Sequence, residues 1–204
     1  MARNTDPIIK NCRRFDISPA VMGYVYASKK ESIRTPHASR MRRKESEYSL
    51  QLREKQKVKF IYGILERQFR LYYEKAAKAP GITGENLLVG IERRLDNVVF
   101  RLGFAMTRRE ARQAVTHGHF TVNGKKVNIP SYQISEGDVI EVKEASRSSK
   151  MFTRLTGEDA PLFTTPEWLE KDKDELKGTV TRLPKREDID FPVDEQLIVE
   201  LYSK

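Results

Sequence analysis

Between residues 91 and 102, apolar positions recur at three- and four-residue steps, which is the spacing of one face of a helix. The apolar positions are Ile91, Leu95, Val98, Val99 and Leu102. The predicted opposite face carries Arg93, Arg94, Asn97 and Arg101. Gly103 follows the last apolar position, and glycine ends a helix at low cost because it adopts positive φ. The pattern therefore predicts a helix with a basic outer face that ends at Gly103.

A second helix is predicted to begin at the run Thr107-Arg-Arg-Glu110. The threonine can cap the helix, while Glu110 reaches back to the amide of the capping residue. The helix should end at Gly118. Its predicted buried positions are Ala111, Ala114 and Val115. Its predicted exposed positions are Arg108, Arg109 and Arg112, so arginines should crowd one side of both helices.

The stretch from Phe120 to Ile129 has the pattern of a β-hairpin. The pair Asn123-Gly124 supplies the two positive φ angles of a type I′ turn. Strict alternation predicts one apolar sheet face, formed by Phe120, Val122, Val127 and Ile129. A third strand is expected over residues 139–142, and residues 178–183 alternate in the same way.

A helical pattern runs from Tyr48 to Ala79, and the apolar run 197–202 is expected to pack on that helical part. The predicted fold class is α+β. We expect a basic N-terminal extension over residues 1–45 and a helical domain over 46–91, with 186–204 packed on it. An RNA-binding domain should then span 92–185, with a core module at 92–155 made of two helices, a β-hairpin and a small antiparallel sheet.

The charge of the 204-residue chain is +9 and is unevenly distributed. Residues 1–44 hold 11 Lys and Arg against 3 Asp and Glu, residues 45–155 hold 20 against 13, and residues 156–204 hold 7 against 13. This distribution favours a polyanionic partner for the first three quarters of the chain. The single cysteine, Cys12, suits a reducing compartment. With neither a secretory signal nor a long apolar run, we expect a cytoplasmic protein without a membrane partner.

Residues suited to catalysis or metal binding are few. The histidines are His37, His117 and His119, and contact with phosphate or helix capping explains the last two as well as catalysis does. Cys12 and His37 cannot supply the four ligands of a structural zinc site. We therefore expect no enzymatic activity, no cofactor and no metal.

The basic residues are instead candidates for contact with RNA phosphates. In the extension the candidates are Arg13, Arg14, Arg40, Arg42, Arg43 and Lys44. In the helical part they are Arg53, Lys55, Lys57 and Lys59. In the core module they are Arg93, Arg94, Arg101, Arg108, Arg109, Arg112, His117, His119, Lys125 and Lys126.

Short runs of the core module resemble the RNA-binding module named after bacterial small-subunit (30S) ribosomal protein S-four. These runs are Arg93-Arg-Leu-Asp-Asn-Val98, Ala111-Arg-Gln113, His117-Gly-His119, Val122-Asn-Gly124 and Ile129-Pro-Ser-Tyr132. Residues outside the module resemble the universal ribosomal S-four family itself. They are Gln51 to Lys57, Tyr62-Gly63, Glu66 to Phe69, Thr83 to Leu88 and the ending Leu197 to Lys204. The likeness thus covers most of residues 45–204, in the form that lacks the cysteines of the zinc knuckle.

This resemblance implies a structural constituent of the small ribosomal subunit that binds a junction in the five-prime domain of small-subunit rRNA early in assembly. It also implies contact with neighbouring small-subunit proteins and with mRNA near the channel through which mRNA enters. Influence on decoding accuracy and, in some relatives, repression of the protein's own operon are further implications.

Two other classes of protein share parts of the pattern. Pseudouridine synthases and tyrosyl-tRNA synthetases include relatives of the module, but each needs a catalytic domain, and only 49 residues follow residue 155. A DNA-binding helix-turn-helix regulator is suggested by two short helices joined over residues 103–107. The predicted hairpin, and arginines spread over both helices, favour recognition of RNA shape instead.

Overall fold

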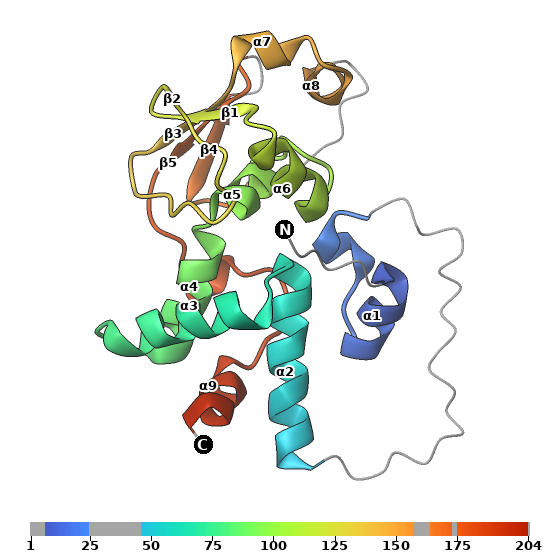
Figure 1. Cartoon of the computed structure of the whole chain (residues 1–204), viewed down its shortest axis with the longest axis vertical. Coiled ribbons are helices and arrows are strands. Elements are labelled where there is room, and N and C mark those ends of the chain that lie inside the picture. The colour runs from blue at the N-terminus through green and yellow to red at the C-terminus, as the bar shows by residue number, and fades with distance from the viewer. Residues whose placement is uncertain (1–6, 25–45, 157–163, 173–174, 204) are drawn as a thin grey trace. The chain divides into compact units, whose positions relative to one another are not determined.

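The computed structural model describes residues 7–24, 46–156, 164–172 and 175–203. The chain divides into two compact units (Figure 1). The first comprises Met1–Leu88 together with Ile189–Lys204, and the second comprises Val89–Asp188. The predicted α+β class is confirmed, because helices make up the described part of the first unit and an antiparallel sheet with helices makes up that of the second.

The described part of the first unit is built from helices. These are α1 (Ile8–Phe15), the 3-10 helix η1 (Pro19–Met22), α2 (Glu47–Tyr62), α3 (Glu66–Lys78), the first part of α4 (Thr83–Glu92) and α9 (Glu195–Ser203). The helical pattern predicted from Tyr48 to Ala79 is two helices, because Gly63 adopts a left-handed conformation with φ 62° and ends α2. Val58, Ile61 and Phe69 are fully buried on both sides of the break, which explains why their spacing looked continuous.

The C-terminal helix α9 lies beside α2 (Figure 1). The side-chain amide of Gln51 donates a 2.9 Å hydrogen bond to the Glu200 carboxylate, and Ile198 is fully buried. The ring of Tyr202 stacks on that of Tyr73 with 4.7 Å between centroids. Segments far apart in the sequence therefore share one hydrophobic core in the first unit.

Glu66, the first residue of α3, accepts three hydrogen bonds from side chains of other helices. Lys55 and Lys59 donate at 2.9 and 2.5 Å, and the Tyr202 hydroxyl donates at 2.8 Å. Burial by itself would raise the pKa of Glu66, but the hydrogen bonds from Lys59, Lys55 and Tyr202 outweigh it and lower the pKa from 4.5 to about 2. The ionised carboxylate of Glu66 therefore links α3 to α2 and α9 through hydrogen bonds.

Replacing Glu66 by glutamine should lower the free energy of unfolding at pH 7 by about 1 kcal/mol, since solvent screens a half-exposed group. Because the folded pKa lies below the ordinary value of 4.5, ionised Glu66 stabilises the fold above pH 4.5, and this contribution is lost as the pH falls toward 2. Urea unfolding at pH 7 and pH 3 measures the difference. Glu74→Gln, at an exposed ion pair of α3, is the control. An equal loss of unfolding free energy at both pH values would contradict the stabilising role of ionised Glu66.

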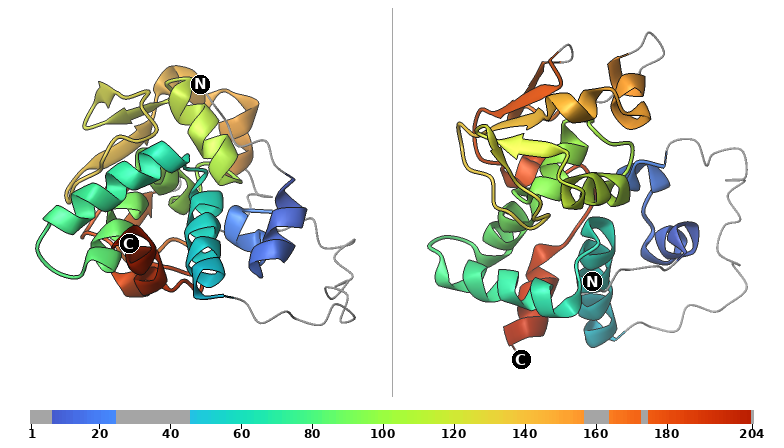
Figure 2. Two further views of the ribbon diagram at one scale, coloured as in Figure 1. Left: turned by 60° about the horizontal axis from the view of Figure 1, so that its bottom comes forward. Right: turned by 45° about the horizontal axis from the view of Figure 1, so that its top comes forward.

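The second unit contains a five-stranded antiparallel sheet with strand order β2-β1-β3-β5-β4. The strands are β1 (Phe120–Val122), β2 (Lys125–Lys126), β3 (Val139–Val142), β4 (Leu169–Asp172) and β5 (Lys177–Val180). The helices described in this unit are the end of α4, α5 (Leu95–Arg101), α6 (Arg108–Thr116), α7 (Glu144–Arg147), α8 (Lys150–Thr156) and the 3-10 helix η3 (Arg186–Asp188). Residues from α5, α6, α8 and the strands form one hydrophobic core, and Figure 2 shows α5 and α6 packed beside the sheet.

The turn between β1 and β2 is the predicted one. Asn123 and Gly124 have φ angles of 50° and 74°, as a type I′ turn requires. The second strand, however, is only two residues long, and Ile129 is 55% exposed, so its predicted place on the apolar face is wrong. After β2 the chain leaves the sheet for the start of α5, where the carbonyl oxygens of Pro130 and Tyr132 accept hydrogen bonds from the amides of Asp96 and Leu95.

The predicted single helix over residues 91–102 is also two helices, although all five of its apolar positions are fully buried. The helix α4 ends at Glu92, and Arg94 is extended, with φ −68° and ψ 137°. The Arg93 carbonyl accepts a 2.9 Å hydrogen bond from the Ile134 amide, and Arg94 forms a β-bridge with Gln133. Pairing with the returning chain thus replaces helical hydrogen bonds at this point.

The cap of α6 forms much as predicted. The Thr107 hydroxyl accepts a 3.1 Å hydrogen bond from the amide of Glu110. The Glu110 carboxylate reaches back to the amide of Met106, at 2.7 Å, one residue before the expected partner. This reciprocal arrangement fixes the direction in which α6 leaves the turn.

Candidate nucleic-acid interface

Three arginines that the sequence placed on an outer face are buried. Arg94, Arg101 and Arg108 are 2%, 7% and 6% exposed. The prediction that they face outward is wrong, because the break at residues 93–94 and the start of α6 bring acidic and amide side chains against them. Each guanidinium has a partner within the second unit.

Glu92 is the acidic centre of the first buried group. Its carboxylate accepts hydrogen bonds from Arg101 at 2.8 and 3.3 Å and from the Asn97 side chain at 2.5 Å. The Asn97 carbonyl oxygen in turn accepts a 3.0 Å hydrogen bond from Arg108, whose guanidinium lies 4.3 Å from the centre of the Phe100 ring. This chain of contacts joins α4, α5 and α6.

Asp96 is the acidic centre of the second group. Arg94 donates to its two oxygens at 3.0 and 2.7 Å, and Arg112 of α6 lies 3.6 Å from one of them. Buried ion pairs of this kind add more to the geometry of a fold than to its stability, but breaking one is costly. The buried arginines Arg94, Arg101 and Arg108 therefore hold the helices rather than contact a ligand.

Other predicted cations of the second unit do reach the surface. Arg109 of α6 and the hairpin residues Lys125 and Lys126 are exposed, and Arg112 is half-buried. Arg93 is half-buried and donates from Nε to the Ile134 carbonyl at 2.8 Å. A rigid scaffold thus presents a smaller set of cations than the sequence predicted.

Gly118 brings the hairpin close to the end of α6. It has φ 72°, and a Cβ atom at this position would lie 2.6 Å from Cε of Lys126. The aliphatic part of Lys126 therefore lies over Gly118, which stands in the sequence between exposed His117 and half-buried His119. Predicted cations of β2 and both predicted histidines gather at this end of the second unit.

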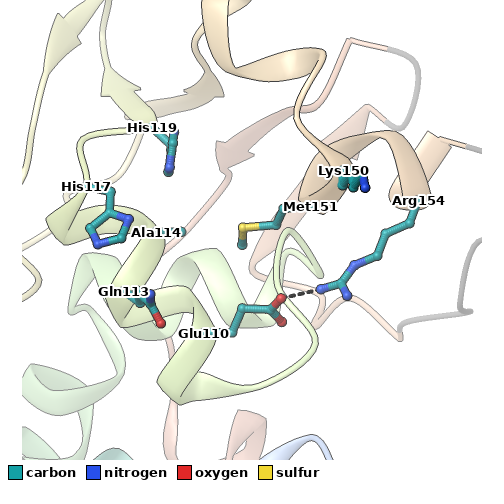
Figure 3. A pocket seen from close by; sticks show the side chains of 8 residues that line it. All are labelled: Glu110, Gln113, Ala114, His117, His119, Lys150, Met151 and Arg154. Atoms are coloured by element: carbon teal, nitrogen blue, oxygen red, sulfur yellow. Dashed lines mark hydrogen bonds and ion pairs between the residues drawn. The ribbon is translucent and has the colours of Figure 1, made fainter.

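Beside the histidines is a cavity of about 320 Å³ (Figure 3). Its lining residues are Glu110, Gln113, Ala114, His117, His119, Lys150, Met151 and Arg154. Gln113, Lys150, Met151 and Arg154 were not among the residues predicted to contact a ligand. The spacing of Met151, Phe152 and Leu155 is a signal that could have predicted a helix there.

The remaining predicted cations belong to the first unit. Arg13 and Arg14 are exposed in the last turn of α1, and Arg53 is half-buried. Lys55 and Lys59 are engaged by Glu66. Lys57 is 8% exposed and pairs with Glu54 at 3.0 Å, so its expected place on the outer surface is wrong. Arg40, Arg42, Arg43 and Lys44 lie outside the described residues.

Cys12 is buried in the first unit. In the described parts of the chain, no group of three or more His, Cys, Asp and Glu residues is placed to hold a metal ion. Nor does any helix within those parts have the length and apolar character needed to cross a membrane.

Comparison with known proteins gives two adjoining family matches. The model of the ribosomal protein S4/S9 N-terminal domain matches residues 3–92, and that of the S4 domain matches residues 93–140. Small ribosomal subunit protein uS4 of Lachnospira eligens is 54% identical over 204 residues, all of both chains. Proteins of the same name from Agathobacter rectalis and Halothermothrix orenii are 53% and 52% identical, again over the whole of both chains.

The α+β fold and its S4 domain define an RNA-binding protein of the ribosomal class. The chain belongs to the uS4 family of small ribosomal subunit proteins. It is a structural constituent of the small subunit that binds rRNA, and it is not an enzyme.

Proposed function

We propose that the protein binds a helical junction in the five-prime domain of small-subunit rRNA and that this binding helps to nucleate assembly of the subunit. A junction presents phosphates from several RNA helices, so cations mounted on a rigid body can fix the angles between those helices. The observation that carries the proposal is the exposed set Arg109, Lys125 and Lys126 on ordered elements. The buried ion pairs of Glu92 and Asp96 hold α6, which carries Arg109, and strand β1, whose Phe120 and Val122 lie in the hydrophobic core, pairs with the strand that carries the two lysines.

Within the proposed interface, phosphate contact is assigned first to these exposed residues, with Arg93 and Arg112 beside them. His117 and His119 are assigned to contact with the RNA at the same end of the second unit. Arg13, Arg14, Arg53, Lys55 and Lys59 are proposed contacts of the first unit. Arg40, Arg42, Arg43 and Lys44 are proposed contacts of the N-terminal extension. Arg94, Arg101, Arg108 and Lys57 are left out of the assignment because burial and acidic or amide partners engage them.

The finer role in the ribosome rests on the family. We propose contact with neighbouring small-subunit proteins through the acidic part, residues 156–204, and a place near the channel through which mRNA enters, with an influence on decoding accuracy. Repression of the protein's own operon would use the same RNA-binding surface. Location in the cytoplasm is part of this proposal, because bacterial ribosomes work there.

A competition assay tests the proposal. The full-length chain is bound to a labelled five-prime-domain transcript and challenged with unlabelled junction RNA or with duplex DNA of equal length. Junction RNA should compete at a concentration at least tenfold lower, since shape readout favours the RNA fold over a uniform duplex. Equal competition by duplex DNA would favour the helix-turn-helix alternative and contradict the proposal.

A further inference from the structure

The cavity beside His117 and His119 is built by two helices and the turn between α6 and β1 (Figure 3). Glu110, Gln113 and His117 stand at three- and four-residue steps and so share one face of α6. Met151 and Arg154 come from α8 on the other side. Both walls lie within one compact unit.

The ring of His119 is held in place from several directions. Its Nδ1 lies 3.0 Å from the hydroxyl oxygen of Ser146, and the ring meets the fully buried Phe152 edge-on at 5.7 Å. Its backbone amide donates to the Ala114 carbonyl at 3.2 Å. The ring of His117 lies 5.9 Å away at 65°. The cavity therefore has a fixed aromatic wall beside an exposed imidazole.

The lining is mixed in a way that suits a flat heteroaromatic ligand. The imidazoles, the Met151 thioether and the Ala114 methyl group offer apolar and aromatic contact, while the Gln113 amide offers one donor group and one acceptor. Lys150 supplies a positive charge. A volume of about 320 Å³ is at the small end for ligand pockets, about 300–1,000 Å³, and so fits one compact group better than a peptide.

A phosphate is a poorer fit for the interior than a base. The Glu110 carboxylate is part of the wall and accepts hydrogen bonds from the Met106 amide and from Arg154, so this wall offers acceptors and engages the Arg154 donors that a phosphate would need. Burial lowers the pKa of His119 below 6.5, and the charges of His117 and Lys143 lower it further. The neutral ring is therefore favoured at pH 7. A neutral imidazole stacks and forms hydrogen bonds but does not attract phosphate as a cation does.

We propose that this cavity receives one unpaired nucleobase of the bound rRNA, with His117 and His119 in contact with its ring, Gln113 on its edge and Lys150 on its phosphate. The inference rests on the proposed function and adds an element of direct recognition to shape readout. Unstacked bases in loops and bulges are commonly read in this way by aromatic side chains and edge contacts.

The test uses the full-length chain and a five-prime-domain transcript of small-subunit rRNA. The double variant Gln113→Ala with His117→Ala removes the proposed contact to the edge of the base and one of the two imidazole rings. Because stacking of a base on an aromatic side chain is worth about 1–3 kcal/mol, the affinity for the transcript should fall about 5- to 150-fold. Thr116→Ala and Thr153→Ala, exposed positions of α6 and α8 outside the cavity, are the matched controls and should bind like wild type. Thermal unfolding of each variant confirms that it folds.

Chemical probing of the base edges gives a second readout. Wild-type protein should protect at least one unpaired base that the double variant leaves reactive, while the rest of the footprint stays. An unchanged affinity and footprint for the folded double variant would overturn the inference. So would a result in which only Lys150→Gln weakens binding, because this would indicate a phosphate contact alone. Failure of wild-type protein to bind the transcript would instead contradict the proposed function itself.

Discussion

Replacing Glu92 by glutamine should lower the free energy of unfolding of the second unit by about 3–5 kcal/mol, because it leaves the guanidinium of Arg101 buried without its counter-charge. Glutamine keeps the size and one oxygen of glutamate, so loss of packing is small. Both Glu92 and Arg101 are almost completely buried, and Asn97 shares the same carboxylate. Urea unfolding, followed by far-UV circular dichroism, measures the loss.

The double variant Glu92→Leu with Arg101→Leu separates charge from packing. Removing both charges should cost less than Glu92→Gln alone, since apolar side chains of similar volume often replace a buried ion pair without large loss. Glu136→Gln, an exposed acid in the loop before β3, is the control and should change stability by less than about 0.5 kcal/mol. A loss below about 1 kcal/mol for Glu92→Gln would show that the pair does not hold the helices as described.

Neutralising Arg109, Lys125 and Lys126 together with glutamine should weaken binding to small-subunit rRNA roughly 100-fold, at about 1 kcal/mol for each lost contact. With about six to ten phosphate contacts, wild-type affinity should fall roughly 10³- to 10⁵-fold between 50 and 200 mM salt. Each lost contact should make the slope of log K against log salt shallower by about 1, so the triple variant should differ by about 3. Filter binding over a salt series measures both quantities.

A matched variant controls for net charge. Lys171, Lys177 and Lys185 carry the same number of charges in the acidic last quarter of the chain, and their neutralisation should change the slope little. An equal effect of both triple variants would mean that total charge, rather than the proposed surface, determines binding. Arg108 is excluded from the first variant, because its burial makes any substitution there a test of folding as well as of binding.

Local features of the fold could be predicted from the sequence. The Asn123-Gly124 turn and the cap at Thr107 depend on residues within a few positions of one another, and both form. The apolar spacing also identified the core, since Leu95, Val98 and Leu102 are all fully buried. Short-range backbone chemistry therefore determined these elements.

Features that depend on distant contacts could not be predicted in the same way. A helical projection places Arg94 and Arg101 on a polar face, and only the pairing of Arg93 and Arg94 with residues 133–134 shows why the helix breaks there. That break lets Glu92 and Asp96 turn inward with the arginines. The cavity beside His119 likewise needs α8, whose place next to α6 depends on the core rather than on any local signal.

The first unit is discontinuous in sequence, since Met1–Leu88 is completed by Ile189–Lys204, while the second is a single uninterrupted stretch. Translation releases the chain from its N-terminus, and domains generally fold as units. We therefore expect the second unit to reach its native packing first. Helix α3 of the first unit cannot complete its packing until Tyr202 is available to stack on Phe69 and Tyr73. A chain truncated after residue 188 should accordingly resist protease over residues 89–156 and remain cleavable in the helices that precede them.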